Sequence, residues 1–222
     1  MKERPVIFNG EMVRALLDGR KTQTRRVMKD QPEVIPQKDE CGVPGYWIPF
    51  NAGKTMVRNE MMKIACPFGG VGDQLWVRET FAILGNEDGC PIDWDGNLIK
   101  GDEKHAARIY KASCWQEPGN YGLWSIPDRD IQYEGTWRPS IHMPRWASRI
   151  TLEITAVRVE RLNSISEEDA KAEGYPVERE VDGGAHDPWL WFRDLWDGIY
   201  PDNDFKVNPW VWVIEFKQVE AK

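Results

Sequence analysis

Several features that would place a protein of this size in a class are missing from the sequence. None of its 222 residues belongs to an apolar run of about eighteen residues, the length that spans a bilayer. The opening stretch, MKERPVIFNG, lacks the apolar core of a secretory signal peptide. We therefore expect no membrane partner and a cytoplasmic location.

Paired cysteines are also missing. The chain has four cysteines, and no two of them form a CxxC pair of the kind that binds zinc: Cys41, Cys66, Cys90 and Cys114. This pattern predicts reduced thiols in a reducing compartment, no metal site and no cofactor. A structural metal held by some of these thiols and His142 is the alternative.

Positive charge is in the minority, with 29 Lys and Arg residues against 36 Asp and Glu and a formal net charge of −7. A protein that coats nucleic acid does so through bulk positive charge, so this balance argues against that class. A small basic cleft is still compatible with it. The 12 tryptophans supply large apolar surfaces, which serve either as core or as stacking platforms.

What is present is a regular order of short elements. NGEMVRALLDG, at 9–19, has an N-cap asparagine, an apolar stripe and a terminal glycine, and so predicts a helix. After this helix, the segment TQTRR is expected to be extended, because it is rich in threonine. The other expected elements are strands at 72–84, 149–162 and 209–219 and helices at 166–174 and 187–198. The apolar face of the last helix is expected to consist of Leu190, Trp191, Leu195 and Trp196.

The segments at about 30–70 and 85–136 mix turn residues with little periodicity and read as insertions. The predicted fold is α+β: a single domain, 1–222, with a small mixed sheet curled into a β-barrel and short helices on its rim. Residues 6–26, 72–84, 149–162 and 209–219 should lie together in it.

The densest positive charge in this acidic chain lies in DGRKTQTRR, from Asp18 to Arg26. One interpretation is a solvated basic turn at the C-terminal end of a helix, where the dipole favours cations. The other is catalytic. A threonine hydroxyl becomes a nucleophile when a base removes its proton, and a lysine acts as that base only when it is neutral. Neighbouring arginines would lower the pKa of such a lysine and could also bind an oxyanion.

The segments LDGRKTQTRR, GDQLWVRE, SISEEDAKAEG and WVWVIEFKQV together resemble the ASCH domain, a PUA-like β-barrel family. The chain looks like the longer, tryptophan-rich members carried by phages and prophages. Its Gly-Arg-Lys-Thr-x-Thr segment is similar to that of small bacterial 4-acetylcytidine amidohydrolases. The resemblance implies a lysine base at Lys21, a threonine nucleophile at Thr24 and a glutamate acid at Glu173, with Arg20, Arg25 and Arg26 around the substrate.

The match of Glu173 to the family's glutamate is the weaker one, because Glu167 and Glu168 lie a turn or two away, and a surface role for Glu173 stays open. Its place at the end of a short helix is favourable to a protonated carboxyl group, which suits an acid.

A second candidate site is TWRPSIHMPRWASR, at 136–149, which interleaves aromatic and basic residues. Its candidate substrate-binding residues could stack and clamp a nucleobase or a phosphate, and they are Trp137, Arg138, His142, Arg145 and Trp146. A loop braced by prolines, with its tryptophans in the core, is the structural alternative.

Three functions remain open at this point. The first is an amidohydrolase that acts on a modified pyrimidine nucleoside such as 4-acetylcytidine. The second is an RNA-binding or nucleic-acid-binding module, with ribonuclease activity as an option. The third is a non-catalytic phage accessory protein that binds a host protein through its insertions.

Overall fold

The computed structural model describes residues 1–29, 31, 33–35, 46–48, 57–58, 66–180 and 184–219. The chain forms two compact units, each built from stretches distant in sequence. Unit 1 comprises Met1–Gly19, Asp73–Glu153 and Lys217–Lys222, and unit 2 comprises Arg20–Gly72 and Ile154–Phe216. None of the helices in the described ranges has the length and apolar character needed to cross a membrane. Cys41 and most of the expected 30–70 insertion lie outside these ranges.

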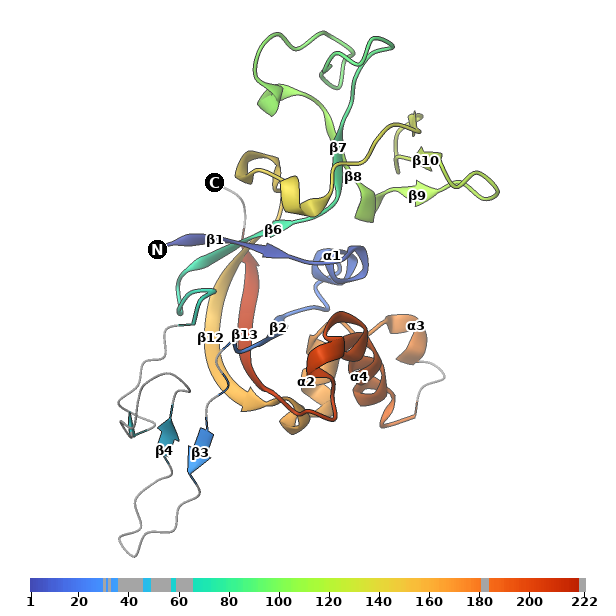
Figure 1. The fold of residues 1–222 in the computed structure, drawn as a ribbon. Coiled ribbons are helices and arrows are strands. Elements are labelled where there is room, and N and C mark those ends of the chain that lie inside the picture. The colour runs from blue at the N-terminus through green and yellow to red at the C-terminus, as the bar shows by residue number, and fades with distance from the viewer. Residues whose placement is uncertain are drawn as a thin grey trace, which may run out of the picture. The chain divides into compact units, whose positions relative to one another are not determined.

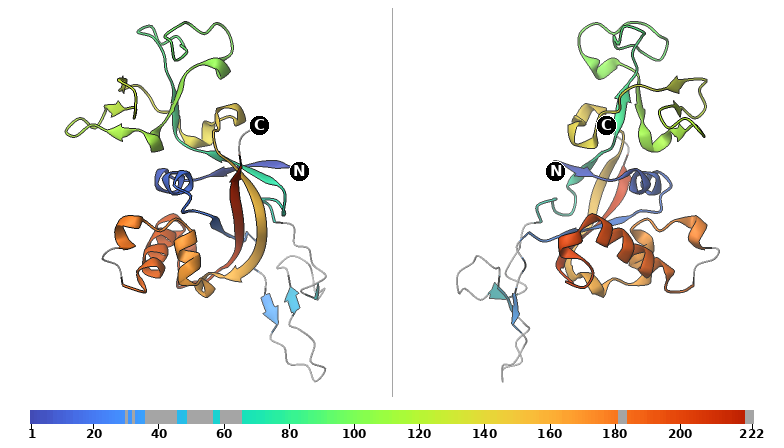
Figure 2. Two further views of the ribbon diagram at one scale, coloured as in Figure 1. Left: turned by 180° about the vertical axis from the view of Figure 1, so that it is seen from behind. Right: turned by 45° about the vertical axis from the view of Figure 1, so that its right-hand side comes forward.

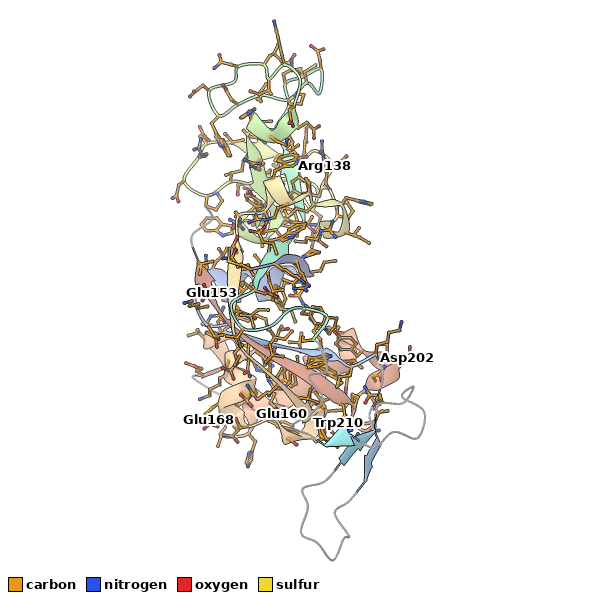
Figure 3. All side chains as sticks on the ribbon, turned by 90° about the vertical axis from the view of Figure 1, so that its left-hand side faces the viewer. Arg138, Glu153, Glu160, Glu168, Asp202 and Trp210 are labelled. Carbon is orange, nitrogen blue, oxygen red and sulfur yellow. The ribbon has the colours of Figure 1, made fainter. Side chains whose placement is uncertain are left out.

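The main sheet has five strands in the order β1-β6-β12-β13-β2 (Figure 1). In unit 1, β1 (Glu3–Ile7) pairs in parallel with β6 (Gln74–Arg78), which pairs antiparallel with the start of β12 (Thr151–Arg161). In unit 2, β13 (Trp210–Val219) pairs antiparallel with β2 (Gln23–Val27). Glu153 and Glu160 lie near the two ends of β12 (Figure 3). Each unit thus pairs strands that are distant in the sequence.

The expected closed barrel is wrong, because within the described residues the sheet is open and ends at β1 and β2. Closure requires hydrogen bonds between the first and last strands. Strand β1 carries Pro5, which has no N–H to donate and suits an edge strand. Mixed strand pairing with separate short helices makes the fold α+β.

Unit 1 adds a helix and small sheets to its share of the main sheet. Helix α1 (Gly10–Leu17) begins at the N-cap Asn9, whose side chain accepts from the Met12 N–H, and Gly19 follows its end at φ 74°. The remaining elements of this unit are β7 (Phe81–Ile83), β8 (Arg108–Tyr110), β9 (Trp115–Gln116), β10 (Trp124–Ser125), β11 (Gln132–Tyr133) and 3₁₀ turns at Glu103–His105, Lys111–Ser113, Ser140–His142 and Arg145–Ala147.

Unit 2 holds the C-terminal helices, and its α2 and α4 pack side by side (Figures 1 and 2). Its remaining elements are α2 (Glu167–Ala172), α3 (Val177–Glu180), α4 (Asp187–Ile199), 3₁₀ turns at Leu162–Ser164 and Pro201–Asn203, and the short strands β3 (Glu33–Ile35), β4 (Tyr46–Ile48) and β5 (Val57–Arg58). Ala170, Phe192, Trp196, Val211 and Val213 belong to one buried cluster, so these helices and β13 share a core.

Two elements differ from expectation. The strand expected at 72–84 is interrupted after Arg78: β6 belongs to the main sheet, and β7 pairs with β8. At the break the Glu79 N–H donates to Met143 Sδ instead of a strand carbonyl. The buried side chains of α4 are Pro188, Phe192 and Trp196, spaced four residues apart, whereas Leu190 is exposed.

Candidate functional site

The basic segment lies between a helix end and a strand, and backbone hydrogen bonds fix it beside α2. After Gly19 the chain leaves α1, and the Thr22 N–H donates to the Ala172 carbonyl at 2.9 Å. The Phe216 N–H of β13 donates to the Thr22 carbonyl, also at 2.9 Å. Helix α2 begins at its N-cap Ser166 and ends at Glu173 and Gly174, whose φ is 108°. These backbone hydrogen bonds place the segment that carries Lys21 beside the end of α2, where Glu173 lies.

Lys21 and Glu173 form a buried ion pair. Lys21 Nζ donates to Glu173 Oε2 and to the Glu173 carbonyl, each at 2.8 Å. Only 2% of Lys21 and 3% of Glu173 is exposed. An ammonium with two acceptors in such a place is held in one geometry, because moving it would leave charged groups buried without partners.

Burial lowers the pKa of Lys21 below its ordinary value. Glu173 opposes this shift through its charge and hydrogen bond, and Arg26 and Arg25 add to the lowering. Arg25 and Arg26 thus contribute to the lowered pKa of Lys21, but removal from water is its largest cause. A lysine with a lowered pKa is neutral more often at a given pH and so is better able to accept a proton.

Arg25 joins the pair to a wider network. Its guanidinium donates from Nη1 to Glu173 Oε1 at 3.1 Å and from Nη2 to Asp169 Oδ2 at 2.9 Å. Asp169 also accepts from the Gln23 amide. Burial pushes the pKa of Asp169 upward, but Arg25, Gln23 and Arg158 together outweigh it and hold the pKa below its usual value. Helix α2 therefore presents two carboxylates to the cations of β2.

Thr24 lies in β2 opposite Ile214 of β13 and is 3% exposed. Neighbouring residues of a strand point to opposite faces of the sheet. Gln23 and Arg25 both reach Asp169 on α2, so Thr24 belongs to the other face of β2. The side chains of Lys21 and Glu173 are thus in direct contact. Thr24 is close to Lys21 in the sequence, but its side chain lies on the other face of β2 from those of Gln23 and Arg25.

The other two arginines of the segment have different surroundings. Arg20 Nη1 donates to the carbonyls of Gly174 and Tyr175, at 3.1 and 2.9 Å, and so caps the end of α2. The Arg26 guanidinium lies over the Phe68 ring, 6.0 Å from its centroid. The contact with Glu173 described above is made by Arg25.

The stretch at 136–149 lies in unit 1, and its candidate residues have separate partners. Arg138, which is labelled in Figure 3, forms a bidentate pair with Glu103, at 2.7 and 2.9 Å. Arg145 donates to Glu3, and Arg108 lies over the Trp146 ring.

Trp137 packs edge-on against Trp124 and Tyr133, and His142 is exposed in a 3₁₀ turn. The arginine head groups at 138 and 145 are thus engaged within unit 1. The structure disperses these side chains among several contacts.

Sequence reasoning missed several members of the network on β2 and α2. Arg158 contacts Glu160, Asp169 and Glu215. The signal for Asp169 was available, since Asp169 and Glu173 are four residues apart and lie on one face of a helix. Gln23 and Arg25 are two apart on one face of a strand. Two carboxylates on one helix face and two donors on one strand face are the pattern that would have indicated contacts between α2 and β2.

Among the described residues, Cys66, Cys90 and Cys114 are thiols and do not form disulfides. Burial raises the pKa of Cys114, which keeps it in the thiol form. Within the described ranges no three His, Cys, Asp or Glu side chains are grouped so that they could hold a metal ion.

Comparison with known proteins gives little. No protein-family model matches the sequence, and no curated protein matches it. A solved structure of an ASCH domain from Lactobacillus crispatus JV V101 is similar over 99% of this chain and 81% of its own, with 12% sequence identity and a TM-score of 0.35. A TM-score this low does not establish a shared fold, so the likeness carries no argument about fold or function.

Proposed function

We propose that the chain is an ASCH-type, PUA-like amidohydrolase that removes an acyl group from a modified pyrimidine nucleoside such as 4-acetylcytidine, without a cofactor. The observation that carries the proposal is the buried contact of 2.8 Å between Lys21 Nζ and Glu173 Oε2. It joins two residues that are 152 positions apart and that the motif resemblance selects as base and acid.

In the proposed reaction Thr24 Oγ1 attacks the acyl carbon, and Lys21 accepts the hydroxyl proton. Glu173 donates a proton to the nitrogen of the leaving cytidine as the C–N bond breaks. The acyl group is then an ester on Thr24. Water attacks this ester, and the carboxylic acid leaves as the threonine hydroxyl is restored.

The proposed reaction needs Lys21 as a neutral amine and Glu173 as a carboxylic acid. Moving one proton along the contact converts an ammonium and a carboxylate into an amine and a carboxylic acid. Burial favours the uncharged pair, as it lowers the pKa of Lys21. Arg25, at 3.1 Å from Glu173 Oε1, favours the charged pair. In this proposal the uncharged pair is the reactive form, and Arg25 is a positioning residue for Glu173.

Two conditions follow from the burial of the site. Lys21, Thr24 and Glu173 are each 3% exposed or less, so the segments over them must open to admit a nucleoside. Thr24 Oγ1 must also come within hydrogen-bond reach of Lys21 Nζ. Movements of segments on the microsecond to millisecond timescale commonly gate enzyme sites in this way.

The nucleic-acid-binding alternative needs cations that are available to phosphate. The contacts of Arg25, Arg138 and Arg145 with carboxylates of their own unit weigh against it. The accessory-protein alternative depends on the insertions, much of the first of which lies outside the described residues. The amidohydrolase is the function that best uses a buried lysine beside a carboxylate.

The proposal is tested by release of cytidine from 4-acetylcytidine. Thr24→Ala, Lys21→Arg and Glu173→Gln should each lower kcat by about 10²–10⁴-fold, the usual contribution of proton transfer. Lys21→Arg is the sharpest, because a guanidinium stays protonated and cannot act as a base. Matched controls are the exposed Thr136→Ala and Lys217→Arg, which should keep the wild-type rate.

The rate should rise with pH through the lowered pKa of Lys21, below the ordinary lysine range. Circular dichroism of each variant separates lost chemistry from lost folding. Full activity of Lys21→Arg would overturn the mechanism. A protein that shifts labelled RNA in a gel but releases no cytidine is the binding module instead.

A further inference from the structure

Unit 1 contains a cavity that the proposed function does not use. Its volume is about 480 Å³, which lies within the usual range of about 300–1,000 Å³ for small-molecule sites. Residues from α1, from the β6–β7 junction, from the Lys111–Ser113 turn and from β10 line it. Phe8, Ala112 and Trp124 give it apolar walls, and Thr80 and Ser140 add hydroxyl groups.

Two cations border this cavity, Arg14 and Lys111. The Lys111 ammonium lies over the Trp124 ring, 4.7 Å from its centroid, and Arg14 Nη1 donates to the Ala112 carbonyl at 3.4 Å. Neither forms an ion pair with any residue in the described part of the chain. In a protein with a net charge of −7, two cations at one cavity without carboxylate partners create a local positive field.

The first turn of α1 adds to that field. Asn9 and Gly10 line the cavity, so the N-terminal end of the helix, with its partial positive charge, borders it. Arg14 extends back toward the same turn: a Cβ built at Gly10 would lie 3.6 Å from Arg14 Nη1. The positive charge of the Arg14 guanidinium and that of the α1 N-terminus are therefore next to the same part of the cavity.

One carboxylate, Glu79, also lines the cavity, and its charge is balanced. Arg149 Nε and Nη2 donate to Glu79 Oε1 and Oε2 at 2.9 and 3.0 Å. Arg149 is held in place by a further bond to Ser113 Oγ at 2.8 Å and by the Tyr110 ring. The charge that remains uncompensated around the cavity is that of Arg14 and Lys111.

We propose that this cavity binds a small organic monophosphate with a flat, largely apolar body, which is the chemistry of a nucleoside monophosphate. The phosphate dianion matches two cations and a helix N-terminus, and the guanidinium offers the paired donors that phosphate accepts. The Trp124 ring and the side chains of Phe8 and Ala112 contact the flat body. Neither Lys21 nor Glu173 is among the residues that line it.

Isothermal titration of the full chain with cytidine 5′-monophosphate and adenosine 5′-monophosphate tests the site, with cytidine and inorganic phosphate as the matched fragments. At least one nucleotide should bind about tenfold or more tightly than either fragment. Arg14→Gln and Lys111→Gln should each weaken that binding about tenfold, and Ser140→Glu, which adds a negative charge at the cavity, should weaken it further. Lys104→Gln, an exposed cation of the same unit, is the control and should change nothing.

Equal affinity for cytidine and its monophosphate would overturn the proposal, because the cations would then play no part. Equal affinity for phosphate and the nucleotides would contradict the proposed contact between the apolar walls and the flat part of the ligand. Binding that survives Arg14→Gln and Lys111→Gln, or the absence of binding to either nucleotide, would overturn the site. Lys21→Arg should leave nucleotide affinity unchanged, so this result and the cytidine-release assay can fail separately.

Discussion

The two units of the molecule hold their notable cations in opposite ways. In unit 2, the side chains of Lys21 and Arg25 are fully buried, and each is paired with a carboxylate on α2. In unit 1, Arg14 and Lys111 border a cavity without a carboxylate partner among the described residues. The difference follows from solvation. A charge removed from water requires a partner, whereas a charge beside a cavity remains hydrated and free to bind a ligand.

The comparison predicts the largest effect at Glu173. Glu173→Ala would leave Lys21 and Arg25 buried without that carboxylate, and breaking a buried pair in this way costs about 3–5 kcal/mol. The free energy of unfolding in urea measures it. The control is Glu103→Ala, which removes the half-exposed partner of Arg138 and should cost about 1 kcal/mol or less. Equal losses at the two sites would contradict the distinction between buried and solvated cations.

A smaller effect is expected from acid. The pKa of Asp169 is lowered in the folded state: burial raises it, but Arg25, Gln23 and Arg158 outweigh burial. A lowered folded pKa stabilises the fold above the unfolded value of about 3.9, and that stability is lost as the pH falls through the folded pKa. Asp169→Asn should therefore flatten the loss of stability below about pH 4. Urea unfolding of both proteins across this range measures the slope, and an unchanged slope would show that Asp169 does not carry it.

The smallest effect on stability is expected at the cavity. Lys111→Ala removes cation–π contacts of a half-buried lysine with Trp124 and Trp137, each worth about 0.5–2 kcal/mol. The melting temperature should barely change, although nucleotide binding should weaken strongly. A loss of stability as large as that of Glu173→Ala would mean that Lys111 stabilises the fold, and it would contradict a role for Lys111 in ligand binding alone.

The elements that the sequence predicts well are those with strong local signals. Asn9 and Gly19 bound α1, and Ser166 and Gly174 bound α2, because caps and left-handed glycines act over one or two residues. The buried face of α4 was mispredicted because the helix has tryptophans on more than one side. Only its packing against Phe205 and β13 decides that Phe192 and Trp196 are buried.

In the candidate site, too, some features could be predicted from the sequence and others depend on the fold. Its residue types came from the motif resemblance, while the contact between Lys21 and Glu173 depends on α2 lying beside β2, which local pattern does not determine. The role of Asp169 as a second carboxylate for Arg25 was missed for that reason, since it comes from an arrangement 144 residues apart in sequence.

The ends of α1 and α2 follow from the sequence alone, because capping and turn formation depend on neighbouring residues. Tertiary structure decided which charges are buried. Lys21 and Arg25 belong to the same basic run as Arg20 and Arg26, but only the docking of α2 on β2 removes the first two from water and pairs them with Glu173. It also left the sheet open at Pro5 and brought Arg14 and Lys111 to one cavity. Solvation and pairing are set by groups distant in sequence, and so they follow from the fold.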